Sequence, residues 1–562
     1  MAIEKRRLGN ILVNAGKITS FQLQEALKAQ KSLGKKLGEI LVDSNIITED
    51  EIIEAIEQQT GIKKIDLNTI EFNRKAISLI PENLCKKYTL IPFGFENNRI
   101  KVTLADPLNI FAIDDVAIST GFEIESFISR KADINKYIGI YYSSQQVDNA
   151  AIQLSKESTK ALKKAKENVD VISDVNSAPV VRMVDYMFKN SIELKASDIH
   201  IEPFENEIRI RYRIDGKLRT INKLGIESLA PLVTRIKIMA GLNIAEKRIP
   251  QDGKIMIKVD DKEIDLRISV LPVVFGEKVV IRILNKGSGI IRKEDLGMDE
   301  ENIKKVNRII SNPHGIILVT GPTGSGKSTT LYSILSELNS NELNIITVED
   351  PVEFTMNGIN QVNVNEKAGL TFASGLRSIL RQDPDIVMIG EIRDEETAEI
   401  AIRAAITGHL VLSTLHTNDA PSSIARLIDM GIKPYLVSTS VAGIIAQRLV
   451  RKVCSNCKTS YEASNYEKRV LGQDINDKLI LYKGCGCGYC QETGYTGRIG
   501  IYEIMELTRK HRQAIDSEVT SDVLRDIGIE NGMNTLEIEC KKLVLQGVTT
   551  MEEFEAITTS EV

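Results

Sequence analysis

The sequence contains no tryptophan and only five histidines, and aromatic residues make up 5% of its 562 residues. It has no run of about 18 or more apolar residues, and its first residues, MAIEKRRLGN, include no apolar core of the kind that signal peptides have. We therefore expect a cytoplasmic protein without a membrane-spanning helix, whose contact with any membrane is peripheral.

An excess of positive charge is also missing. The formal net charge is -5, so no overall positive field would attract nucleic acid, and a polyanion would need a local basic patch. Hydrophobic residues make up 42% and charged residues 27%, which is typical of globular proteins. The chain is too long for one hydrophobic core, and its length predicts about three to five domains.

Cysteine is scarce but clustered. Five of the seven cysteines lie between Cys454 and Cys490, where Cys454-Ser-Asn-Cys457 and Cys487-Gly-Tyr-Cys490 form two pairs separated by a long insert. Four thiolates suit a structural Zn²⁺, which binds four ligands tetrahedrally at about 2.3 Å and keeps no open position. Buried thiols without metal are the alternative, and Cys485 is ambiguous, although only Cys487 has two-residue spacing to Cys490. The remaining two, Cys85 and Cys540, are expected to be small buried side chains.

The start of the chain contains an internal repeat, whose two copies align with a constant offset. Each copy predicts a short helix, a turn at Gly16 or Asn45, and a longer amphipathic helix. Residues 1–60 are therefore predicted to be a helical tandem-repeat module. The alignment pairs Arg7-Leu8-Gly9 with Lys36-Leu37-Gly38, Leu12 with Leu41, Ile18 with Ile47, Leu23 with Ile52, Leu27 with Ile56 and Gln30 with Gln59.

Residue patterns divide the rest of the chain into four segments. Residues 61–142 predict a small α+β domain, and residues 143–177, rich in Ser, Lys, Gln and Asn, predict a linker with a partly helical centre. Residues 178–288 predict a second α+β domain, with turns at Asp215-Gly216 and Asp252-Gly253 between its strands. Residues 289–562 alternate apolar strands with helices, which indicates a mostly parallel sheet covered on both faces.

A phosphate-binding loop follows the apolar run at 316–320. Its glycines let backbone N–H groups converge on phosphate oxygens, and the following helix adds its N-terminal dipole. Lys327 can reach the β and γ phosphates, and Ser328 can ligate Mg²⁺. A Gly-rich turn that binds nothing is the alternative. The predicted nucleotide-binding residues of the loop are Gly321, Pro322, Thr323, Gly324, Ser325, Gly326, Lys327, Ser328 and Thr329.

Acidic residues end two later apolar strands, where an α/β sheet presents its ligand-binding edge. Glu349 and Asp350 follow the strand at 344–348, and they suit the binding of metal-bound water. Glu391 follows the strand at 385–390 and is the best candidate to orient and polarise the attacking water. Gly390 stands where many P-loop enzymes have an Asp for Mg²⁺, so this strand is not expected to ligate the metal directly. Solvated helix or strand caps are the alternative.

Two histidines flank the next apolar strand, in the run from Thr407 to Thr417. His409 and His416 could sense the γ-phosphate, because an imidazole can be neutral or charged near neutral pH. The alternative is that each is an ordinary packing residue.

Four blocks of sequence resemble the secretion ATPase superfamily that drives type II secretion and type IV pilus assembly. They are GPTGSGKSTT (321–330), ITVEDPVEF (346–354), the run from LRSILRQDPDIVMIGEIRDE to LSTLHTNDA (376–420), and EKRIPQDG (246–253). The resemblance covers nearly all residues from Ala178 onward. It implies a multidomain α/β protein with a C-terminal RecA-like P-loop ATPase domain (289–562), a PAS-like α+β domain before it (178–288), and N-terminal regulatory domains.

The same resemblance implies a homo-hexamer that binds ATP and Mg²⁺ between the RecA-like domain and the preceding domain. Arginines from a neighbouring subunit then act on the transition state, where an arginine finger is worth roughly three to five orders of magnitude in rate. Arg213 and Arg235 resemble these positions loosely, and solvated arginines are the alternative. The zinc element at 454–490 resembles assembly ATPases rather than retraction motors. The competitors for the finger role are Arg211, Arg219 and Arg248.

The N-terminal repeat resembles tandem motifs of domains that bind cyclic di-GMP. Two copies at a fixed offset suit a ligand with two equivalent halves, although Lys36 and Asn45 depart from the pattern and Lys lacks the planar fork of Arg. A helical docking module that binds only protein partners is the alternative. The candidate contacts are Arg7, Leu8, Gly9, Leu12, Gln30, Lys36, Leu37, Gly38, Leu41 and Gln59.

Taken with these features, the resemblance implies an ATP-hydrolysing motor at the inner face of the cytoplasmic membrane. It would move an inner-membrane platform protein so that pilin subunits are extracted and polymerised, with membrane association through such partners and no nucleic acid. A type II secretion ATPase is the close alternative. A DNA translocase and a nucleotide-binding scaffold without turnover are further hypotheses, which the near-neutral charge and the presence of Lys327, Ser328 and Glu391 disfavour.

Overall fold

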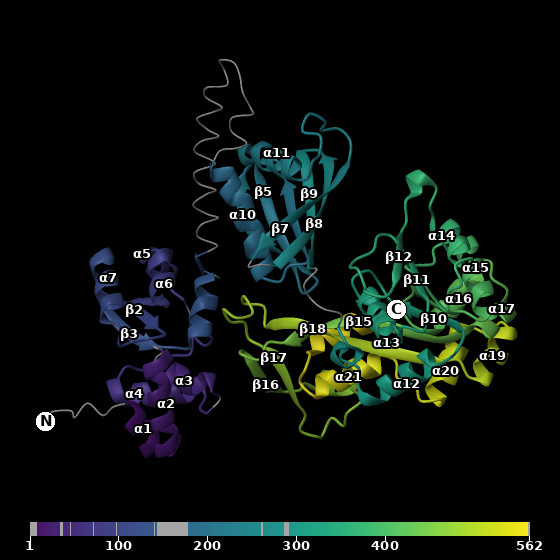
Figure 1. The fold of residues 1–562 in the computed structure, drawn as a ribbon. Coiled ribbons are helices and arrows are strands. Elements are labelled where there is room, and N and C mark those ends of the chain that lie inside the picture. The colour runs from purple at the N-terminus through teal and green to yellow at the C-terminus, as the bar shows by residue number, and fades with distance from the viewer. Residues whose placement is uncertain are drawn as a thin grey trace. The chain divides into compact units, whose positions relative to one another are not determined.

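The structure is a computed structural model of the 562-residue chain. It describes residues 8–33, 37–44, 46–70, 72–96, 98–139, 141–142, 178–259, 262–285 and 291–559. The predicted linker, 143–177, lies outside these residues. The chain forms two compact units, the first containing most of residues 1–283 and the second most of residues 284–562, and each is described by itself (Figure 1).

Four helices at the N-terminus reproduce the repeat. The first and third helices begin at Leu8 and Leu37, which the sequence alignment pairs, and the second and fourth begin at the same offset. Each longer helix begins after a threonine that caps it: Thr19 accepts a hydrogen bond from the backbone of Gln22, and Thr48 accepts one from Glu51. The helices are α1 (Leu8–Asn14), α2 (Ser20–Leu33), α3 (Leu37–Asp43) and α4 (Glu49–Thr60).

The core of this helical module also follows the repeat. Leu12 and Leu41 are fully buried at equivalent positions. A Cβ atom on Gly9 would lie 2.5 Å from Leu23 Cδ1, and one on Gly38 would lie 3.3 Å from Ile52 Cγ2, so both glycines allow close helix packing. Gly16 has the positive φ of 68° that its predicted turn requires, whereas Asn45 lies outside the described residues.

Residues 61–142 fold around a three-stranded sheet. Strands β1 and β2 are antiparallel, and β2 and β3 are parallel, so α7 serves as the crossover between the parallel pair. Cys85 is fully buried in the core, as predicted, and burial raises the pKa of its thiol to about 12. The elements are α5 (Arg74–Leu79), α6 (Glu82–Tyr88), β1 (Leu90–Glu96), β2 (Arg99–Leu104), α7 (Ile110–Thr120) and β3 (Glu123–Ile128).

The next domain has a six-stranded sheet in the order β6-β5-β4-β9-β8-β7. Strand β5 alternates buried and half-buried residues, as expected for a sheet with one covered face. Asp215 and Gly216 form the predicted β5–β6 turn, with φ values of 47° and 84°. The elements are α10 (Ala178–Glu193), β4 (Asp198–Pro203), β5 (Glu207–Ile214), β6 (Lys217–Gly225), η1 (Ile226–Ser228), α11 (Leu229–Met239), β7 (Gln251–Val259), β8 (Lys262–Val273) and β9 (Gly276–Asn285).

The predicted turn at Asp252-Gly253 is wrong, because both residues lie within strand β7. Gly253 serves close packing instead. A Cβ atom there would lie 2.9 Å from Leu242 Cδ2 and 3.0 Å from the Ala240 carbonyl oxygen, so a larger residue would clash with the end of the preceding helix.

A seven-stranded sheet in the order β12-β11-β13-β14-β10-β15-β18 forms the centre of the second unit. All neighbouring strands are parallel except β15 and β18, which are antiparallel. This confirms the predicted mostly parallel sheet. The strands are β10 (Gly315–Thr320), β11 (Ile345–Glu349), β12 (Asn360–Asn363), β13 (Ile386–Ile389), β14 (Leu410–Leu415), β15 (Val441–Val453) and β18 (Tyr495–Glu506).

Helices cover both faces of this sheet (Figure 1). Ile316 and Leu318 of β10 pack into one hydrophobic cluster, while Ile317 and Val319 pack into another on the opposite face. One face is covered by η2 (Lys293–Leu296), α12 (Glu300–Ile310) and α13 (Lys327–Leu338). The other is covered by α14 (Phe372–Ile379), α15 (Glu395–Ile406), α16 (Pro421–Asp429), α17 (Pro434–Ser440), α19 (Arg509–Asp516) and α20 (Ser521–Glu530).

A third cluster surrounds the cysteine-rich element and includes Cys540, which is fully buried as predicted. Its elements are β16 (Lys458–Glu462), α18 (Asn465–Val470), β17 (Ile480–Gly484), α21 (Leu536–Leu545) and α22 (Met551–Thr558), and η3 (Glu366–Ala368) follows β12 elsewhere. Among the described residues, no helix combines the length and the apolar character needed to cross a membrane.

Candidate nucleotide and metal sites

The phosphate-binding loop connects the end of β10 to the start of α13, in the predicted order of strand, loop and helix. Gly321, Gly324 and Gly326 have φ values of 144°, 81° and 93°. A Cβ atom on Gly321 would also lie 2.4 Å from the Gln447 carbonyl oxygen. Both the backbone conformation and the close approach therefore require glycine in this loop.

Lys327 folds back onto the loop. Its Nζ donates hydrogen bonds to the carbonyl oxygens of Gly321 at 2.8 Å and Pro322 at 3.2 Å. Burial, and to a lesser degree the nearby Arg448, lower the pKa of Lys327, while Glu391 acts in the opposite direction. The ammonium is thus already positioned within the loop that would receive a phosphate chain.

The strand ends next to the loop are in register. Val348 of β11 pairs with Ile389 of β13, Ile389 with Ser413 of β14, and Leu415 of β14 with Thr320 of β10. Because these strands are parallel, the residues that follow them gather at one edge of the sheet, beside the phosphate-binding loop.

Glu391 lies at this edge directly after β13, and its side chain is 15% exposed. Arg393 forms an ion pair with Glu391 Oε1, and Nε2 of His416 lies 3.3 Å from Oε2. Glu391 also acts electrostatically on Lys327. The structure therefore brings together three predicted residues, Glu391, His416 and Lys327.

Glu349 has a different environment. It is 4% exposed, and its carboxylate accepts hydrogen bonds from Tyr332 of α13, from Thr347 at 2.5 Å and from Gln361 at 3.1 Å. These bonds join the end of β11 to the helix of the phosphate-binding loop. Asp350, the next residue, is exposed.

His409 lies away from the loop. Its backbone carbonyl accepts a hydrogen bond from Gly315 at the start of β10, whereas the loop follows the end of that strand. The length of β10, about 20 Å, separates the two ends. The His409 ring instead lies 2.9 Å from the Ala404 carbonyl oxygen. The structure therefore places His409 away from the phosphate-binding loop of its own subunit, and a contact of His409 with nucleotide stays a prediction.

The two predicted finger arginines lie on the six-stranded domain. Arg213 Nε is 3.5 Å from Asp198 Oδ2, and its Nη1 donates to the Gly216 carbonyl at 3.0 Å. Arg235 of α11 has a buried Nε with no hydrogen-bond partner among the described residues. Arg211, a competitor, makes two hydrogen bonds to the buried Glu202, at 2.7 and 3.0 Å.

The four predicted zinc ligands come together. The Sγ atoms of Cys454, Cys457, Cys487 and Cys490 all lie within 4.8 Å of one another. Four sulfurs around one tetrahedral Zn²⁺ would be about 3.8 Å apart, and Cys487 Sγ and Cys490 Sγ are 3.7 Å apart. The exposed Cys485 is not in the group, which resolves the ambiguity in favour of Cys487. The residues fit a structural zinc site.

The candidate cyclic di-GMP residues divide into two sets. Leu12 and Leu41 are fully buried, and Gly9 and Gly38 face Leu23 and Ile52, so these four shape the helical core. The half-buried residues of the set are Leu8, Leu37, Gln30 and Gln59, and Arg7 and Lys36 lie outside the described residues.

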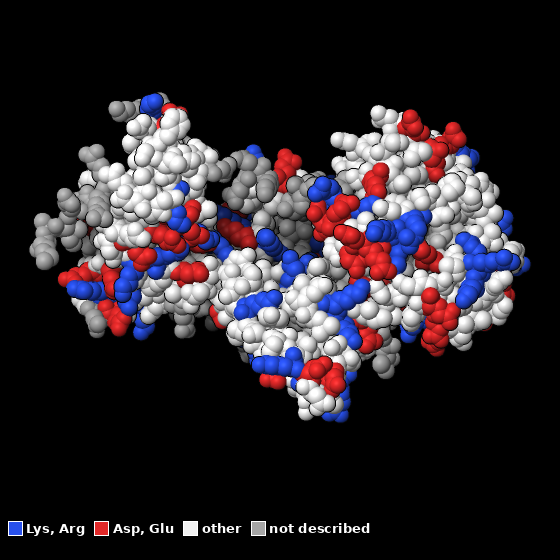
Figure 2. All heavy atoms as spheres, turned by 90° about the horizontal axis from the view of Figure 1, so that it is seen from below, with Lys and Arg blue, Asp and Glu red and all other residues white. Residues whose placement is uncertain are grey.

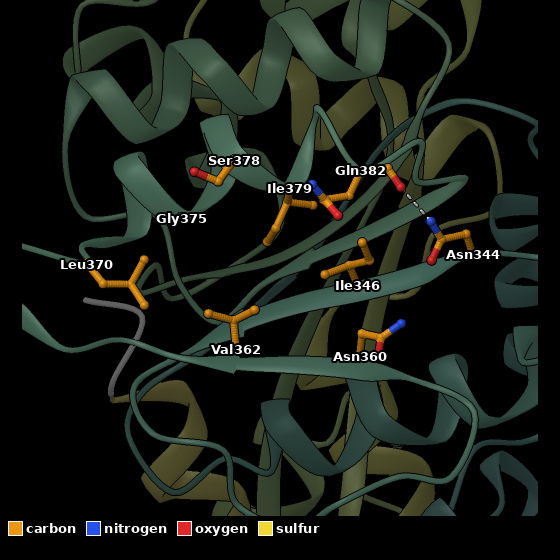
Figure 3. A pocket seen from close by; sticks show the side chains of 9 residues that line it. All are labelled: Asn344, Ile346, Asn360, Val362, Leu370, Gly375, Ser378, Ile379 and Gln382. Atoms are coloured by element: carbon orange, nitrogen blue, oxygen red, sulfur yellow. Dashed lines mark hydrogen bonds between the residues drawn. The ribbon is translucent and has the colours of Figure 1, made fainter.

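A separate hollow of about 430 Å³ lies between the edge strand β12, β11 and α14. Figure 3 shows Ile346, Val362 and Ile379 in it, with the Asn344 side chain donating to the Gln382 carbonyl at 2.8 Å. None of its lining residues was predicted to bind nucleotide.

Two charged residues of the candidate nucleotide site were not predicted. Arg393 pairs with Glu391, and Arg448 of β15, 9% exposed, acts on Lys327 and donates to the Asn418 side chain at 3.0 Å. The position of Arg393, two residues after Glu391 at a strand end, was a usable signal because alternate residues share a face. Arg448 is distant in sequence from the predicted site residues, so no sequence pattern indicated that it lies near Lys327.

Comparison with known proteins agrees with this architecture. Residues 173–556, more than half of the chain, match the family described as type II/IV secretion system protein. The chain belongs to this family. Residues 60–148 match the family described as MshEN domain, so the family member carries an N-terminal domain of that kind.

The sequence similarity to relatives extends over most of the length of this chain. A protein of Myxococcus xanthus named type IV pilus assembly ATPase PilB is 40% identical over 560 residues, covering 97% of this chain and 98% of its own. A protein of Pseudomonas aeruginosa named type II secretion system protein E is 47% identical over 425 residues, covering 75% and 84%. The structure of the Legionella pneumophila ATPase DotB shares the fold, with 22% identity, a TM-score of 0.51, and coverage of 67% and 95%.

Proposed function

We propose that this chain is a hexameric ATPase motor that powers type IV pilus assembly at the inner face of the cytoplasmic membrane. The observation that carries the proposal is the meeting of the phosphate-binding loop, Lys327 and Glu391 at one edge of the parallel sheet. The nearly full-length similarity to a protein named for pilus assembly supports the process.

Hydrolysis would use the residues of this edge. The backbone N–H groups of residues 321–328 bind the phosphates, and Lys327 exchanges its two carbonyl partners for phosphate oxygens. Ser328 would ligate Mg²⁺, which neutralises charge on the β and γ phosphates. Glu391 orients the attacking water and accepts its proton, since it is the partly exposed carboxylate next to Lys327. The buried Glu349 holds α13 in place through Tyr332, and Asp350 is the exposed acid available to metal-bound water.

A ring supplies the remaining groups in this proposal. Arg235, with its unpartnered buried Nε, and Arg213 are the arginines that we assign to a neighbouring subunit's nucleotide. The six-stranded domain that carries them is the one we propose to be PAS-like. The partners are other copies of the chain and an inner-membrane platform protein, through which the motor reaches the membrane and extracts pilins.

The zinc element has a structural role in the proposal. Cys454, Cys457, Cys487 and Cys490 would hold Zn²⁺, and four thiolates leave no position for a reacting ligand. The glycines at its base allow the chain to cross itself closely, because a Cβ atom on Gly484 would lie 2.1 Å from the Gly494 carbonyl oxygen. The element therefore stabilises the fold.

We further propose that the tandem-repeat module binds cyclic di-GMP. The observed repeat of a short and a longer helix at a constant offset supports a binding site with two equivalent halves. Calorimetry of the full chain with cyclic di-GMP tests this proposal, and Arg7→Ala should weaken binding at least tenfold. If the heat of binding is unchanged in this variant, or absent in the wild type, the alternative of a module that docks only protein partners is favoured.

A type II secretion ATPase is the second candidate, favoured by the 47% identity to the secretion protein over 425 residues. A DNA translocase fits less well. The net charge is -5, and on the face shown in Figure 2 acidic and basic side chains form small adjacent groups of both signs. The described residues on this face therefore form no long basic path for a strand of nucleic acid.

Deletion of the gene tests the process. The proposal expects cells without surface pili but with normal export of secreted enzymes, and the wild-type gene should restore the pili. Loss of export with normal piliation would support the type II secretion alternative instead.

A further inference from the structure

Arg393 lies in a short connection that the fold holds rigidly. The connection runs from the end of β13 to the start of α15. The Gly390 N–H donates to the Val348 carbonyl at 2.8 Å, and the Ile392 N–H donates to the Thr414 carbonyl at 3.1 Å. Both neighbouring strands therefore fix the backbone on either side of Glu391.

The side chains of this connection alternate. Ile392 is 3% exposed and packs into the main hydrophobic cluster of the sheet. Glu391 and Arg393, on either side of it, pair with each other outside that cluster. The next residue, Asp394, caps α15 by accepting a hydrogen bond from the Thr397 N–H at 2.8 Å. The spacing of Arg393 from Glu391 is thus set at both ends.

Each oxygen of the Glu391 carboxylate has its own partner. Arg393 Nη2 contacts Oε1, and His416 Nε2 lies 3.3 Å from Oε2. Lys327 is a further cation that interacts with Glu391, and Asp350 and Glu366 are carboxylates that also interact with Arg393. Arg393 therefore lies among three carboxylates at this edge of the sheet.

We propose that Arg393 is a positioning residue for ATP hydrolysis. Together with His416, Arg393 holds the Glu391 carboxylate in the orientation in which this carboxylate can activate the attacking water. This assignment rests on the proposed ATPase function. A glutamate side chain is flexible, and a base must lie within hydrogen-bond distance of the water that it activates. Misplacement by about 1 Å is enough to slow a reaction about a hundredfold.

An ordinary surface ion pair would behave differently. Arg393 is 63% exposed, and exposed pairs contribute about 0–1 kcal/mol to stability, so its removal should leave folding intact. The effect of the pairing should therefore be on turnover, and it should depend on Glu391.

A double-mutant cycle tests this dependence. In the full chain, Arg393→Ala should lower kcat about tenfold to a hundredfold with the KM for ATP within about twofold, and Arg393→Lys should restore part of the loss. In a Glu391→Gln background, the residual ATP turnover is measured by the release of radiolabelled phosphate. There Arg393→Ala should lower the turnover no further. Arg403→Ala, which breaks an exposed ion pair to Glu399 on α15, is the matched control and should leave kcat unchanged.

Three results would overturn the assignment. An equal loss of kcat in both backgrounds would mean that Arg393 acts independently of Glu391, and a rise in kcat for Arg393→Ala would make it an inhibitory contact. An unchanged kcat for Arg393→Ala would mean that Arg393 is an ordinary surface arginine without a role in turnover. In each of these cases the wild type still hydrolyses ATP, whereas a wild type without hydrolysis would refute the proposed function itself.

Discussion

At the scale of single residues, Glu202 shows how charges are held in the six-stranded domain. Burial alone would raise its pKa, but hydrogen bonds from Arg211 and Lys278 outweigh burial and hold the pKa of Glu202 at about 2. Its side chain is 8% exposed, and Lys278 Nζ lies 2.9 Å from Oε1. A carboxylate with a lowered pKa stabilises the fold when it is ionised.

Glu202→Gln is therefore expected to destabilise the protein at neutral pH, by about 3 kcal/mol, because it leaves the half-buried Arg211 and Lys278 without their buried carboxylate partner. The stabilisation by Glu202 is fully present above its ordinary pKa of 4.5 and is lost as the pH falls toward about 2. Urea unfolding across this range should show the difference from wild type shrinking with acidity. Glu207→Gln, which removes a more exposed partner of Arg209, is the control and should change stability by less than about 1 kcal/mol. A difference for Glu202→Gln that did not depend on pH would contradict this account.

Prediction from sequence was uneven at this scale. The loop glycines, Lys327 and Glu391 could be placed because their motif lies between a strand and a helix. His409 could not, since only the structure shows that β14 pairs in parallel with β10, which puts the residue before β14 at the opposite end from the loop that follows β10. The burial of Glu349 depends on Tyr332 and Gln361, which come from two other elements.

At the scale of elements, the tandem repeat offers two matched glycines. An alanine Cβ at position 9 would lie 2.5 Å from a Leu23 methyl group, but at position 38 it would lie 3.3 Å from Ile52. Since alanine favours a helix by about 1 kcal/mol over glycine, Gly38→Ala should be nearly neutral, and Gly9→Ala should lower stability by about 1 kcal/mol. Thermal unfolding of the two variants measures this, and equal effects would mean that the copies are packed alike.

The zinc element gives a second test at this scale. Cys454→Ser should lose the bound zinc and lower the unfolding temperature, because three thiolates bind the metal more weakly and its binding contributes to folding. Cys485→Ser should keep one zinc per chain, since Cys485 lies outside the cluster. Metal analysis of both variants measures the zinc bound per chain. Loss of zinc from the Cys485 variant would mean that the ligand set is different.

Elements were the most predictable part of the molecule. Period-four apolar positions predicted the repeat helices, and apolar runs predicted the parallel strands. The turn at Asp252-Gly253 failed because glycine there provides space for Leu242 and Ala240, which no local pattern reveals. The order of the strands in the sheet was also not predicted, because it depends on pairing between distant segments.

At the scale of the whole molecule, the chain joins one ATPase core to two kinds of addition. The phosphate-binding loop, Lys327 and Glu391 form the core, while the zinc element and the N-terminal repeat adapt it. In the ring that we propose, Arg213 and Arg235 are the arginines assigned to a neighbouring subunit's nucleotide. The match to the family covers residues 173–556, so it includes both the core and the cysteine-rich element and leaves the N-terminal repeat outside.

The most direct measurement is ATP turnover by the purified chain with Mg²⁺, compared with its Glu391→Gln variant, with ATP binding measured for both. We predict that the wild type hydrolyses ATP and that the variant binds ATP with similar affinity but turns it over at least about a hundredfold more slowly. Equal turnover by the two proteins would contradict it, and so would a wild type that neither binds nor hydrolyses ATP.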